Sequence, residues 1–434
     1  MAKKFLSFLG TNDYVECNYE CSVGKVESVR YVQEATIKLF CRDWGKNDSA
    51  IFFLTSDARR SNWENQNDKN RRLKDRLREL NIPISIIEKD IPDGIDEDEL
   101  YNIFSAIYES IESKDEVVFD ITHALRSIPM LAIVVLNYSK ILKNVEVRHI
   151  LYGAFETLGT KQKVEKMDIK DRNAPILDLI ALVKIQDWTT SSYNFVKNGI
   201  TKDICGLMDE DVKPILRRTE GKDEMARKLN TLSKAMKEFE GLFSTVRGRE
   251  ILERKTIDEK LLPLLKDLAS SETFIKPLNP ILKNLYDRII EFSRSEDKVS
   301  TGLNAVAWCF EHGLIQQSIT LMQELIITKI LIDAGYEWRD KKFRDLASQS
   351  VYIKSRDIPE DSWDISEENK GCARKMMNLK IVEEIKGIYS QLSIMRNDIN
   401  HGGFTYNSKN SNRISEESKK VFENLLEVFS ECKK

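Results

Sequence analysis

The residues best suited to chemistry lie near the C-terminus, in the segment R-N-D-I-N-H at positions 396–401. Arg396 and His401 form an Arg-x4-His motif. An arginine can hold a phosphate by charge-assisted hydrogen bonds, and a histidine can transfer protons near neutral pH. Of the four histidines in the chain, only His401 has an arginine four to six residues upstream. A solvated arginine beside a histidine that caps a helix would show the same spacing, so the motif alone does not decide between these interpretations.

The motif ends a segment with helical periodicity. Apolar residues recur at helical spacing over 381–399, and Gly402 and Gly403 are typical helix stop signals. At about 100° per residue, Asn397 and His401 lie on the same face, whereas Arg396 and His401 diverge by about 140°. Arg396 must therefore reach around the helix, or the helix must loosen near its end, if the two side chains are to act together.

The N-terminal third alternates short apolar runs with amphipathic stretches. We expect strands at 5–9, 50–55, 84–87, 117–120 and 145–152, and helices at 32–44, 69–80, 96–111 and 129–142. Short apolar strands separated by helices of this length predict an α/β domain with a Rossmann-like, doubly wound and mostly parallel sheet. Such a sheet binds ligands in the crevice outside the carboxyl ends of its strands.

Small and polar residues follow three of these strands and are candidates for binding an anionic ligand, because backbone amides beside glycine and threonine can donate to anionic oxygens. The sequence has no Gly-x-Gly-x-x-Gly after the first strand and no P-loop motif, which disfavours dinucleotide and P-loop sites. An alternative for Arg126 is an ion pair with Asp120 at the strand-to-helix corner. The candidate ligand residues are Gly10, Thr11, Asn12, Thr55, Ser56, Thr122, His123, Ala124, Arg126 and Ser127.

Past about residue 160 the strand signal ends, and apolar residues recur at helical spacing. We expect a first helix at 176–188, opened by Pro175, and further helices at 228–243, 261–268, 281–292, 302–310 and 317–334. The charged segment 161–172 is predicted to connect the domains. These patterns predict a ligand-sensing domain at 1–165, a helical connecting region at 166–300 and a second helical domain at 301–434.

Two residues near the predicted turn at Gly313 have a structural and a chemical interpretation. His312 stands immediately before this glycine and is predicted to cap a helix rather than to catalyse. Glu324 is expected to face the helix that carries the motif, either as an ion-pair partner or with a part in the chemistry.

The composition is that of a soluble protein without a broad basic surface. The 434 residues include 67 basic and 70 acidic ones, for a net charge of −3, so any nucleic-acid contact is expected to be local. The seven cysteines show no zinc-ligand spacing and are predicted to be free thiols in a reducing cytosol. The longest apolar stretch, near 128–138, is shorter than the roughly 20 residues that span a bilayer. We therefore expect a cytoplasmic protein.

Several segments resemble a known family. The runs I-P-D-G-I-D-E-D-E-L-Y-N-I-F (91–104) and V-V-F-D-I-T-H-A-L-R-S-I-P-M (117–130), with F-L-G-T-N-D-Y (8–14) and V-R-Y-V-Q-E-A (29–35), resemble the CARF domain, the CRISPR-associated Rossmann fold. With the Arg-x4-His motif, the whole chain resembles the CARF–HEPN ribonucleases that accompany type III CRISPR systems. The segment 301–434 would then be the HEPN domain. Asn12 and Ala124 stand where family members often have glycine.

The resemblance implies a metal-independent endoribonuclease that cleaves single-stranded RNA and is activated by a cyclic oligoadenylate bound to the CARF domain. The 2′-hydroxyl of RNA is an internal nucleophile beside the phosphate, so no catalytic metal or cofactor is expected. Arg396 would hold the phosphate, His401 would transfer protons and Asn397 would orient one of them. The products would be a 2′,3′-cyclic phosphate and a 5′-hydroxyl.

The family builds its catalytic site from two protomers, which implies a homodimer with two Arg396-His401 pairs around one cleft. A ligand shared by two symmetric CARF domains suits an even-numbered ring, and we favour cyclic tetra-adenylate over the hexa-adenylate. Two alternatives stay open: a CARF sensor without nuclease activity, and a ring nuclease that degrades its own activator with Thr11, Asn12, His123 or Arg126.

Overall fold

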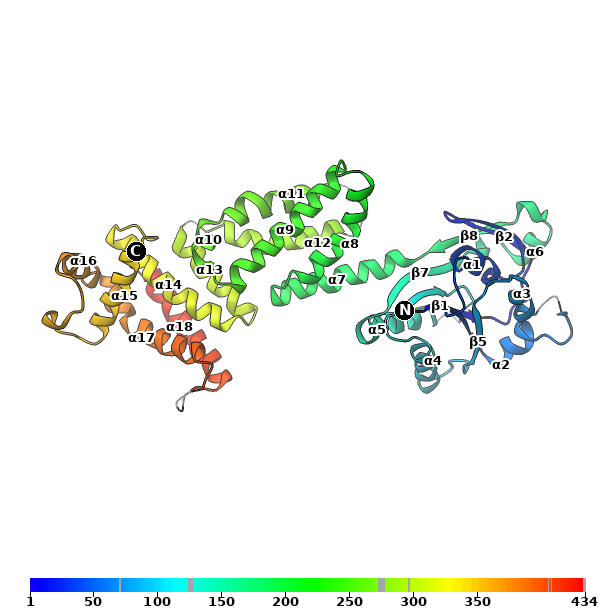
Figure 1. Cartoon of the computed structure of the whole chain (residues 1–434), viewed down its shortest axis with the longest axis horizontal. Helices are drawn as coiled ribbons and strands as arrows, with labels where there is room; N and C mark the ends of the chain where they lie inside the picture. The colour runs from blue at the N-terminus through cyan, green and yellow to red at the C-terminus, as the bar shows by residue number, and fades with distance from the viewer. Residues whose placement is uncertain are drawn as a thin grey trace. The chain divides into compact units, whose positions relative to one another are not determined.

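The computed structural model describes residues 1–69, 72–123, 128–271, 278–295, 297–404, 406 and 408–431. The chain divides into two compact units, Met1–Gln186 and Asp187–Lys434 (Figure 1). The first unit is built on a β-sheet with helices, and the described part of the second is helical.

An eight-stranded sheet in the order β3-β2-β8-β7-β6-β1-β4-β5 forms the centre of the first unit. The pairs β1/β4, β4/β5, β1/β6, β6/β7 and β2/β8 are parallel, whereas β2/β3 and β7/β8 are antiparallel. The predicted mostly parallel, doubly wound sheet is thus confirmed. The strands are β1 (Lys3–Leu9), β2 (Cys17–Cys21), β3 (Gly24–Val29), β4 (Ser49–Leu54), β5 (Ser85–Asp90), β6 (Glu116–Asp120), β7 (Glu146–Gly153) and β8 (Asn173–Asp178).

Helices cover both faces of this sheet. They include α1 (Val32–Phe40), α2 (Ser56–Ala58), α3 (Leu73–Glu79), α4 (Glu97–Glu109), α5 (Ile128–Lys143) and α6 (Lys161–Glu165). Phe5 and Phe52 pack on one face with α1 and α3, and Leu6 and Phe53 pack on the other face with α4 and α5. Strands that are buried on both faces have nearly continuous apolar sequences, which is why β1 and β4 were predictable.

The segment around Pro175 forms a strand, β8, and not the start of a helix as predicted. The strand signal was expected to end near residue 160 and Pro175 to open a helix, but β8 pairs with both β2 and β7. Pro175 lies inside this strand, where its carbonyl accepts a hydrogen bond from Ala154 N at 2.9 Å. The missing proline N–H is tolerated because β8 is short and its pairing uses other donors. The helix predicted at 176–188 begins only at Ile180, as α7, and the domain boundaries at 165 and 300 stay predictions.

The second unit consists of helices packed around one core. The helix α14 buries side chains around most of its circumference and packs against α13, α15, α17 and α18. Among the described residues, no helix is long and apolar enough to cross a membrane. The bounds are α7 (Ile180–Asn198), α8 (Lys202–Arg218), α9 (Glu224–Ser244), α10 (Gly248–Glu253), α11 (Leu262–Ser270), α12 (Leu278–Ser293), α13 (Lys298–Glu311), α14 (Ile315–Ala334), α15 (Lys341–Ser355), α16 (Glu367–Met377), α17 (Lys380–Asn400) and α18 (Ser411–Glu431).

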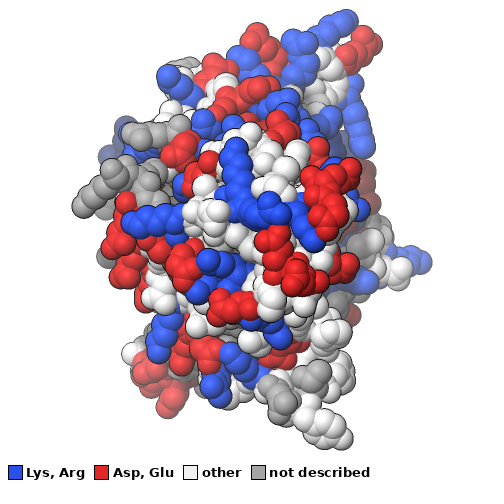
Figure 2. All heavy atoms as spheres, turned by 90° about the vertical axis from the view of Figure 1, so that its left-hand side faces the viewer, with Lys and Arg blue, Asp and Glu red and all other residues white. Residues whose placement is uncertain are grey.

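Charged side chains of both signs are mixed on the surface. On the face drawn in Figure 2, basic and acidic side chains alternate over most of the visible area. This distribution agrees with the sequence, which contains nearly equal numbers of basic and acidic residues, 67 and 70.

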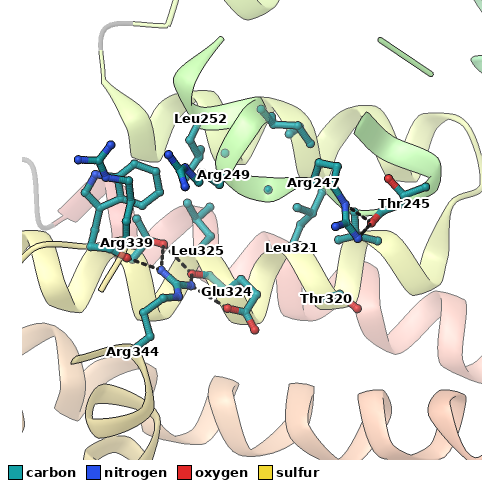
Figure 3. Close-up of a pocket in the computed structure, with 17 residues that line it drawn as sticks. Thr245, Arg247, Arg249, Leu252, Thr320, Leu321, Glu324, Leu325, Arg339 and Arg344 are labelled. Atoms are coloured by element: carbon teal, nitrogen blue, oxygen red, sulfur yellow. Dashed lines mark hydrogen bonds and ion pairs between the residues drawn. The ribbon is translucent and has the colours of Figure 1, made fainter. Parts of the chain in front are cut away.

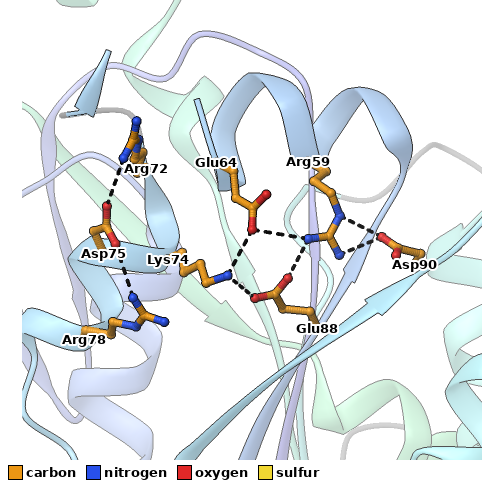
Figure 4. Close-up of polar contacts among 8 residues, drawn as sticks. All are labelled: Arg59, Glu64, Arg72, Lys74, Asp75, Arg78, Glu88 and Asp90. Atoms are coloured by element: carbon orange, nitrogen blue, oxygen red, sulfur yellow. Dashed lines mark hydrogen bonds and ion pairs between the residues drawn. The ribbon is translucent and has the colours of Figure 1, made fainter. Parts of the chain in front are cut away.

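An ion-pair network ties the edge strand β5 to the helical segments beside it (Figure 4). Glu88 Oε2 lies 2.5 Å from Arg59 Nη1, and Glu88 Oε1 lies 2.6 Å from Lys74 Nζ. Arg59 also pairs with Asp90 at 2.7 Å, and Lys74 pairs with Glu64 at 3.0 Å. Burial raises the pKa of Glu88, but hydrogen bonds from Lys74, Arg59 and Trp63 outweigh it and lower that pKa to about 2.

We predict that Glu88→Gln lowers the free energy of unfolding of the first unit at neutral pH. The folded pKa of Glu88 is about 2, against an ordinary value of 4.5, so the advantage of the wild type is complete above about pH 4.5 and is lost as the pH falls through about 2. Urea unfolding across this range measures the difference. Glu79→Gln, an exposed change in α3, is the control. If the difference in free energy of unfolding between the wild type and Glu88→Gln stays constant as the pH falls to about 2, the proposed role of the network is wrong.

Candidate functional site

A cavity of about 420 Å³ lies in the first unit, beside the ends of β1, β6 and β7. We call it the first-unit cavity. Its lining comes from the loop after β1, the start of the loop after β6, the end of β7 and the segment that follows β7. This is the edge at which doubly wound sheets bind ligands.

Two cations stand at the first-unit cavity and share one carboxylate. Asp13 Oδ1 lies 2.7 Å from Arg30 Nη2, and Asp13 Oδ2 lies 2.7 Å from Lys161 Nζ. Tyr152 OH donates to Glu156 Oε1 at 2.6 Å, and this hydrogen bond raises the pKa of Tyr152 to about 12. An anionic ligand would find a guanidinium and an ammonium group here, held in place by Asp13.

His123 and Tyr14 form an aromatic wall of the cavity, with ring centroids 4.2 Å apart. Burial lowers the pKa of His123 to about 3, so its imidazole is neutral at physiological pH. Its Nε2 atom is buried and has no hydrogen-bond partner among the described residues. Burial also raises the pKa of the Tyr14 phenol, which therefore stays protonated. Both groups are suited to hydrogen bonding with a base or a sugar rather than to pairing with a phosphate charge.

Thr122 holds the loop that leaves β6. Its hydroxyl donates to Asp120 Oδ1 at 2.6 Å and accepts from Gly153 N at 2.8 Å. Asp120 is fully buried and also accepts from Thr122 N at 3.0 Å and from Ser7 Oγ at 3.4 Å. Burial raises the pKa of Asp120 to about 6, although these hydrogen bonds lower it in part. Thr122 is therefore occupied in positioning the loop.

The structure brings together some of the predicted ligand residues. Asn12, Thr122 and His123 line the first-unit cavity. Gly10 lies beside it, since an added Cβ would come 2.3 Å from Tyr14 OH. Thr11 and Ser56 are exposed and lie outside the lining. Thr55 is partly buried and also lies outside it, and its Oγ1 accepts a hydrogen bond from Ala58 N at 3.3 Å. Ala124, Arg126 and Ser127 lie outside the described residues.

Sequence reasoning missed several residues of the cavity. Arg30 precedes α1, Tyr152 lies near the end of β7 and Lys161 begins α6, so Arg30 is far in sequence from the other two. Tyr152 was available in principle, because it stands at the carboxyl end of a predicted strand. Lys161 carried no local signal. Arg30 lies in the V-R-Y-V-Q-E-A segment that resembles the CARF domain, but only the fold brings these two residues to Asp13.

The Arg-x4-His motif lies where α17 ends, as predicted. His401 follows the last helical residue, and its N–H donates to Asn397 O at 3.0 Å. Gly402 and Gly403 have φ of +64° and +71°, in the left-handed region that glycine adopts without strain. Asn397 and His401 are both exposed. His401 thus combines the capping position of the structural interpretation with the accessibility that proton transfer requires.

Arg396 points toward a different helix. Its Nη1 donates to Gln323 Oε1 at 2.9 Å and lies 3.7 Å from Glu324 Oε1, both on α14. Glu324 also accepts from Arg344 Nη2 at 2.7 Å. The predicted position of Glu324 opposite the motif helix is confirmed, and its observed contacts are ion pairs. Arg396 remains 37% exposed, so part of its guanidinium is open to a ligand.

His312 has a structural role, as predicted. It caps α13, its Nδ1 lies 2.7 Å from Trp308 O, and its ring centroid lies 4.0 Å from that of the Trp308 ring. Among the residues that the structure describes, no group of three or more His, Cys, Asp and Glu side chains could hold a metal ion.

Comparison with known proteins identifies the first unit. Residues 4–156 match the family model described as "CRISPR system endoribonuclease Csx1, CARF domain". This part of the chain is a CARF domain. All lining residues of the first-unit cavity except Lys161 lie in the matched segment, and we call it the CARF cavity.

Two further proteins are similar to this chain. CRISPR-associated protein MJ1674 of Methanocaldococcus jannaschii is 25% identical over 241 residues, which is 55% of this chain but only 33% of that relative's length. The structure of Enterococcus italicus Csm6 bound to cyclic hexa-2′-fluoro-hexa-dAMP aligns over 99% of this chain and 95% of its own chain, with 12% identity and a TM-score of 0.36. A TM-score this low does not establish a shared fold.

We predict that Asp120 makes the stability of the CARF domain depend on pH. Because the pKa of Asp120 rises from 3.8 to about 6 on folding, the folded state binds more protons in this range. The free energy of unfolding of the wild type should therefore fall relative to that of Asp120→Asn as the pH rises from about 4 to about 6, and the difference should then stay constant. The titration of His123 contributes equally to the pH dependence of the wild type and of Asp120→Asn. Unfolding curves measure the effect, with the exposed change Asp93→Asn as the control; parallel pH profiles for Asp120→Asn and wild type would refute it.

Proposed function

We propose that this chain is a CRISPR-associated endoribonuclease that cleaves single-stranded RNA when a cyclic oligoadenylate binds its CARF domain. The observation that carries the proposal is the combination, in one chain, of a CARF domain with a helical unit in which α17 ends in Arg396 and His401. The matched family model is named for a CRISPR system endoribonuclease, and the similar archaeal protein is named as CRISPR-associated, which supports this assignment.

The CARF cavity has the chemistry that a nucleotide ligand needs. Arg30 and Lys161 offer charges to phosphates, while Asn12 and the neutral imidazole of His123 offer hydrogen bonds to a base or a ribose. A cavity of about 420 Å³ is small for a whole ring of nucleotides, so the ring would be shared between two copies of the chain. A symmetric pair of cavities favours an even-numbered ring, and cyclic tetra-adenylate is our choice.

An apolar stripe on α5 supports the homodimer. Met130, Val134, Tyr138, Ile141 and Leu142 repeat at helical spacing and are 45–82% exposed. Such a stripe is unusual on the surface of a monomer and is typical of an interface. It begins directly after the predicted ligand loop, so pairing of two chains there would join their ligand sites.

The proposed reaction uses the 2′-hydroxyl of RNA as the nucleophile. It attacks the adjacent phosphorus, the 5′-oxygen leaves, and the products are a 2′,3′-cyclic phosphate and a 5′-hydroxyl. His401 transfers protons at one of these oxygens, Asn397 orients it, and the exposed part of Arg396 offsets the charge that develops on the phosphate. One Arg and one His do not supply a base, an acid and a phosphate clamp, so the site is completed by the second protomer. No catalytic metal is required, because the nucleophile is already held beside the phosphate.

The two alternatives require different things of the residues in the CARF cavity and in the Arg-x4-His motif. A ring nuclease in the CARF cavity would need an activated group there, but the Thr122 hydroxyl is engaged by Asp120 and Gly153, and His123 with a pKa of about 3 is a weak base. A sensor without nuclease activity would tolerate any change at Arg396 and His401. RNA cleavage by variants at Arg396 and His401 distinguishes the sensor from the proposed nuclease, and timed analysis of the bound cyclic oligoadenylate distinguishes the ring nuclease.

We predict that His401→Ala and Arg396→Ala each reduce RNA cleavage by roughly 100- to 10,000-fold, because each removes a group that acts in the transition state. Binding of the cyclic oligoadenylate and the melting temperature should change little, since both residues are at least partly exposed at a helix end. A gel assay of a labelled single-stranded RNA measures the rate. Asn400→Ala, an exposed change one residue before His401, is the control. Near-normal cleavage by either motif variant would refute the catalytic assignment.

We predict that Arg30→Gln and Arg126→Ala each raise the concentration of activator that gives half-maximal cleavage, while cleavage at saturating activator persists. Both arginines are assigned to the ligand site and not to the catalytic motif, and a ligand shifts an equilibrium only through its differential affinity for the active state. Titration of RNA cleavage with cyclic tetra-adenylate measures this change. Arg42→Gln, an exposed change in the same unit, serves as the control. If both variants need the same concentration of cyclic tetra-adenylate as the wild type for half-maximal cleavage, the proposed ligand site is wrong.

A further inference from the structure

The second unit contains a cavity that the proposed function does not use. It has a volume of about 440 Å³ and lies between α10, with the turn before it, and the helices α13 and α14 (Figure 3). The volume is within the range of roughly 300–1,000 Å³ that small-molecule sites occupy. All of its lining residues belong to the second unit.

Part of the wall of this cavity is apolar. Ile251 from α10 and Leu321 and Leu325 from α14 are 1%, 7% and 3% exposed. Trp338 also lines the cavity and is partly exposed. An indole next to leucine side chains offers a flat, desolvated surface of the kind on which a nucleobase stacks.

Arginines stand at both ends of the cavity. Figure 3 shows Arg249 and Arg339 at one end and Arg247 at the other. Arg249 and Arg339 share Glu253, at 2.9 and 3.5 Å. Arg247 donates from Nε and Nη2 to the neutral carbonyl of Thr245, at 2.9 and 2.6 Å, and no carboxylate among the described residues pairs with it.

The turn that presents Arg247 is strained. Val246, just before it, has φ of +55°, a conformation that β-branched residues rarely adopt. Backbone strain of this kind persists only where the surrounding structure enforces it, and it is concentrated at ligand-binding sites. The turn thus fixes a positive charge at the edge of an apolar cavity.

We infer that this cavity binds one phosphorylated nucleoside, with the phosphate on Arg247 and the base against Leu321, Leu325 and Trp338. The inference rests on the proposed function, because an RNA strand is the first source of such a unit; a free nucleotide is the second.

The cavity is connected to the motif. Glu324 lines it and joins Arg344, at 2.7 Å, to Arg396, at 3.7 Å, so an occupant that contacts this carboxylate changes the surroundings of Arg396.

Direct binding tests this inference without reference to cleavage. The full chain carrying His401→Ala, which leaves RNA intact, is titrated with uridine 5′-monophosphate and with a short fluorescein-labelled oligouridylate. Uridine avoids the adenine recognition expected of the CARF cavity. Arg247→Gln should weaken binding by about tenfold, the effect of losing one charge-assisted contact. Leu321→Trp, which fills the cavity, should weaken it similarly, and Arg218→Gln, an exposed change on α8, should not.

The probes that bind more weakly to the variants show whether the ligand is a free nucleotide or part of an RNA strand. Weaker binding of both probes assigns the cavity to free nucleotides as well as RNA, and weaker binding of oligouridylate alone assigns it to an RNA strand. Unchanged binding of both probes by both variants overturns the inference. Leu321→Trp is interpreted only if its melting temperature matches the parent, whereas the exposed Arg247→Gln is informative by itself. If oligouridylate binds through Arg247 while the protein with intact His401 cleaves no RNA, the inference stands and the proposed nuclease function fails.

Discussion

The chemistry proposed for the second unit depends on the contact between Arg396 and the helix α14. Around α17, Arg396 and His401 diverge by about 140°, so α17 alone cannot direct both toward one phosphate. Gln323 and Glu324 hold the arginine by a hydrogen bond of 2.9 Å and an ion pair of 3.7 Å. A partly exposed ion pair of this kind contributes little to stability, typically less than about 1 kcal/mol. Its importance is geometric, because it fixes the direction of a guanidinium.

The rigidity of that contact comes from the surroundings of α14. Ile326, Ile330 and Leu331 are fully buried, and the helix packs against α13, α15, α17 and α18. Arg344 adds hydrogen bonds to Thr328 and to the backbone of Trp338 and holds Glu324 Oε2, while Arg396 contacts Glu324 Oε1. The same principle applies in the CARF domain, where buried Asp120 fixes Thr122 and so positions the loop after β6. In both units a carboxylate orients the groups that would contact a ligand.

Much of this architecture could be predicted from the sequence because its signals are local. The strands β1, β4 and β6 carry nearly continuous apolar residues, and the helix stop after His401 is marked by two glycines. The strands β2, β3 and β8 were missed because they are short and partly exposed, and Pro175 within β8 suggested a helix start. The position of Glu324 opposite the motif helix was predictable from the family resemblance of its segment. Arg30 and Lys161 were not, since they meet Asp13 only after the sheet has formed.

The central claim is that ligand binding to the CARF domain controls RNA cleavage in the same chain. The most direct measurement is the rate at which the wild-type protein cleaves a labelled single-stranded RNA in excess EDTA, with and without cyclic tetra-adenylate, together with the chemical nature of the new RNA ends. We expect a severalfold faster reaction with the ligand, and products that end in a 2′,3′-cyclic phosphate. A rate that is the same with and without cyclic oligoadenylates, or cleavage that requires magnesium, would contradict the account.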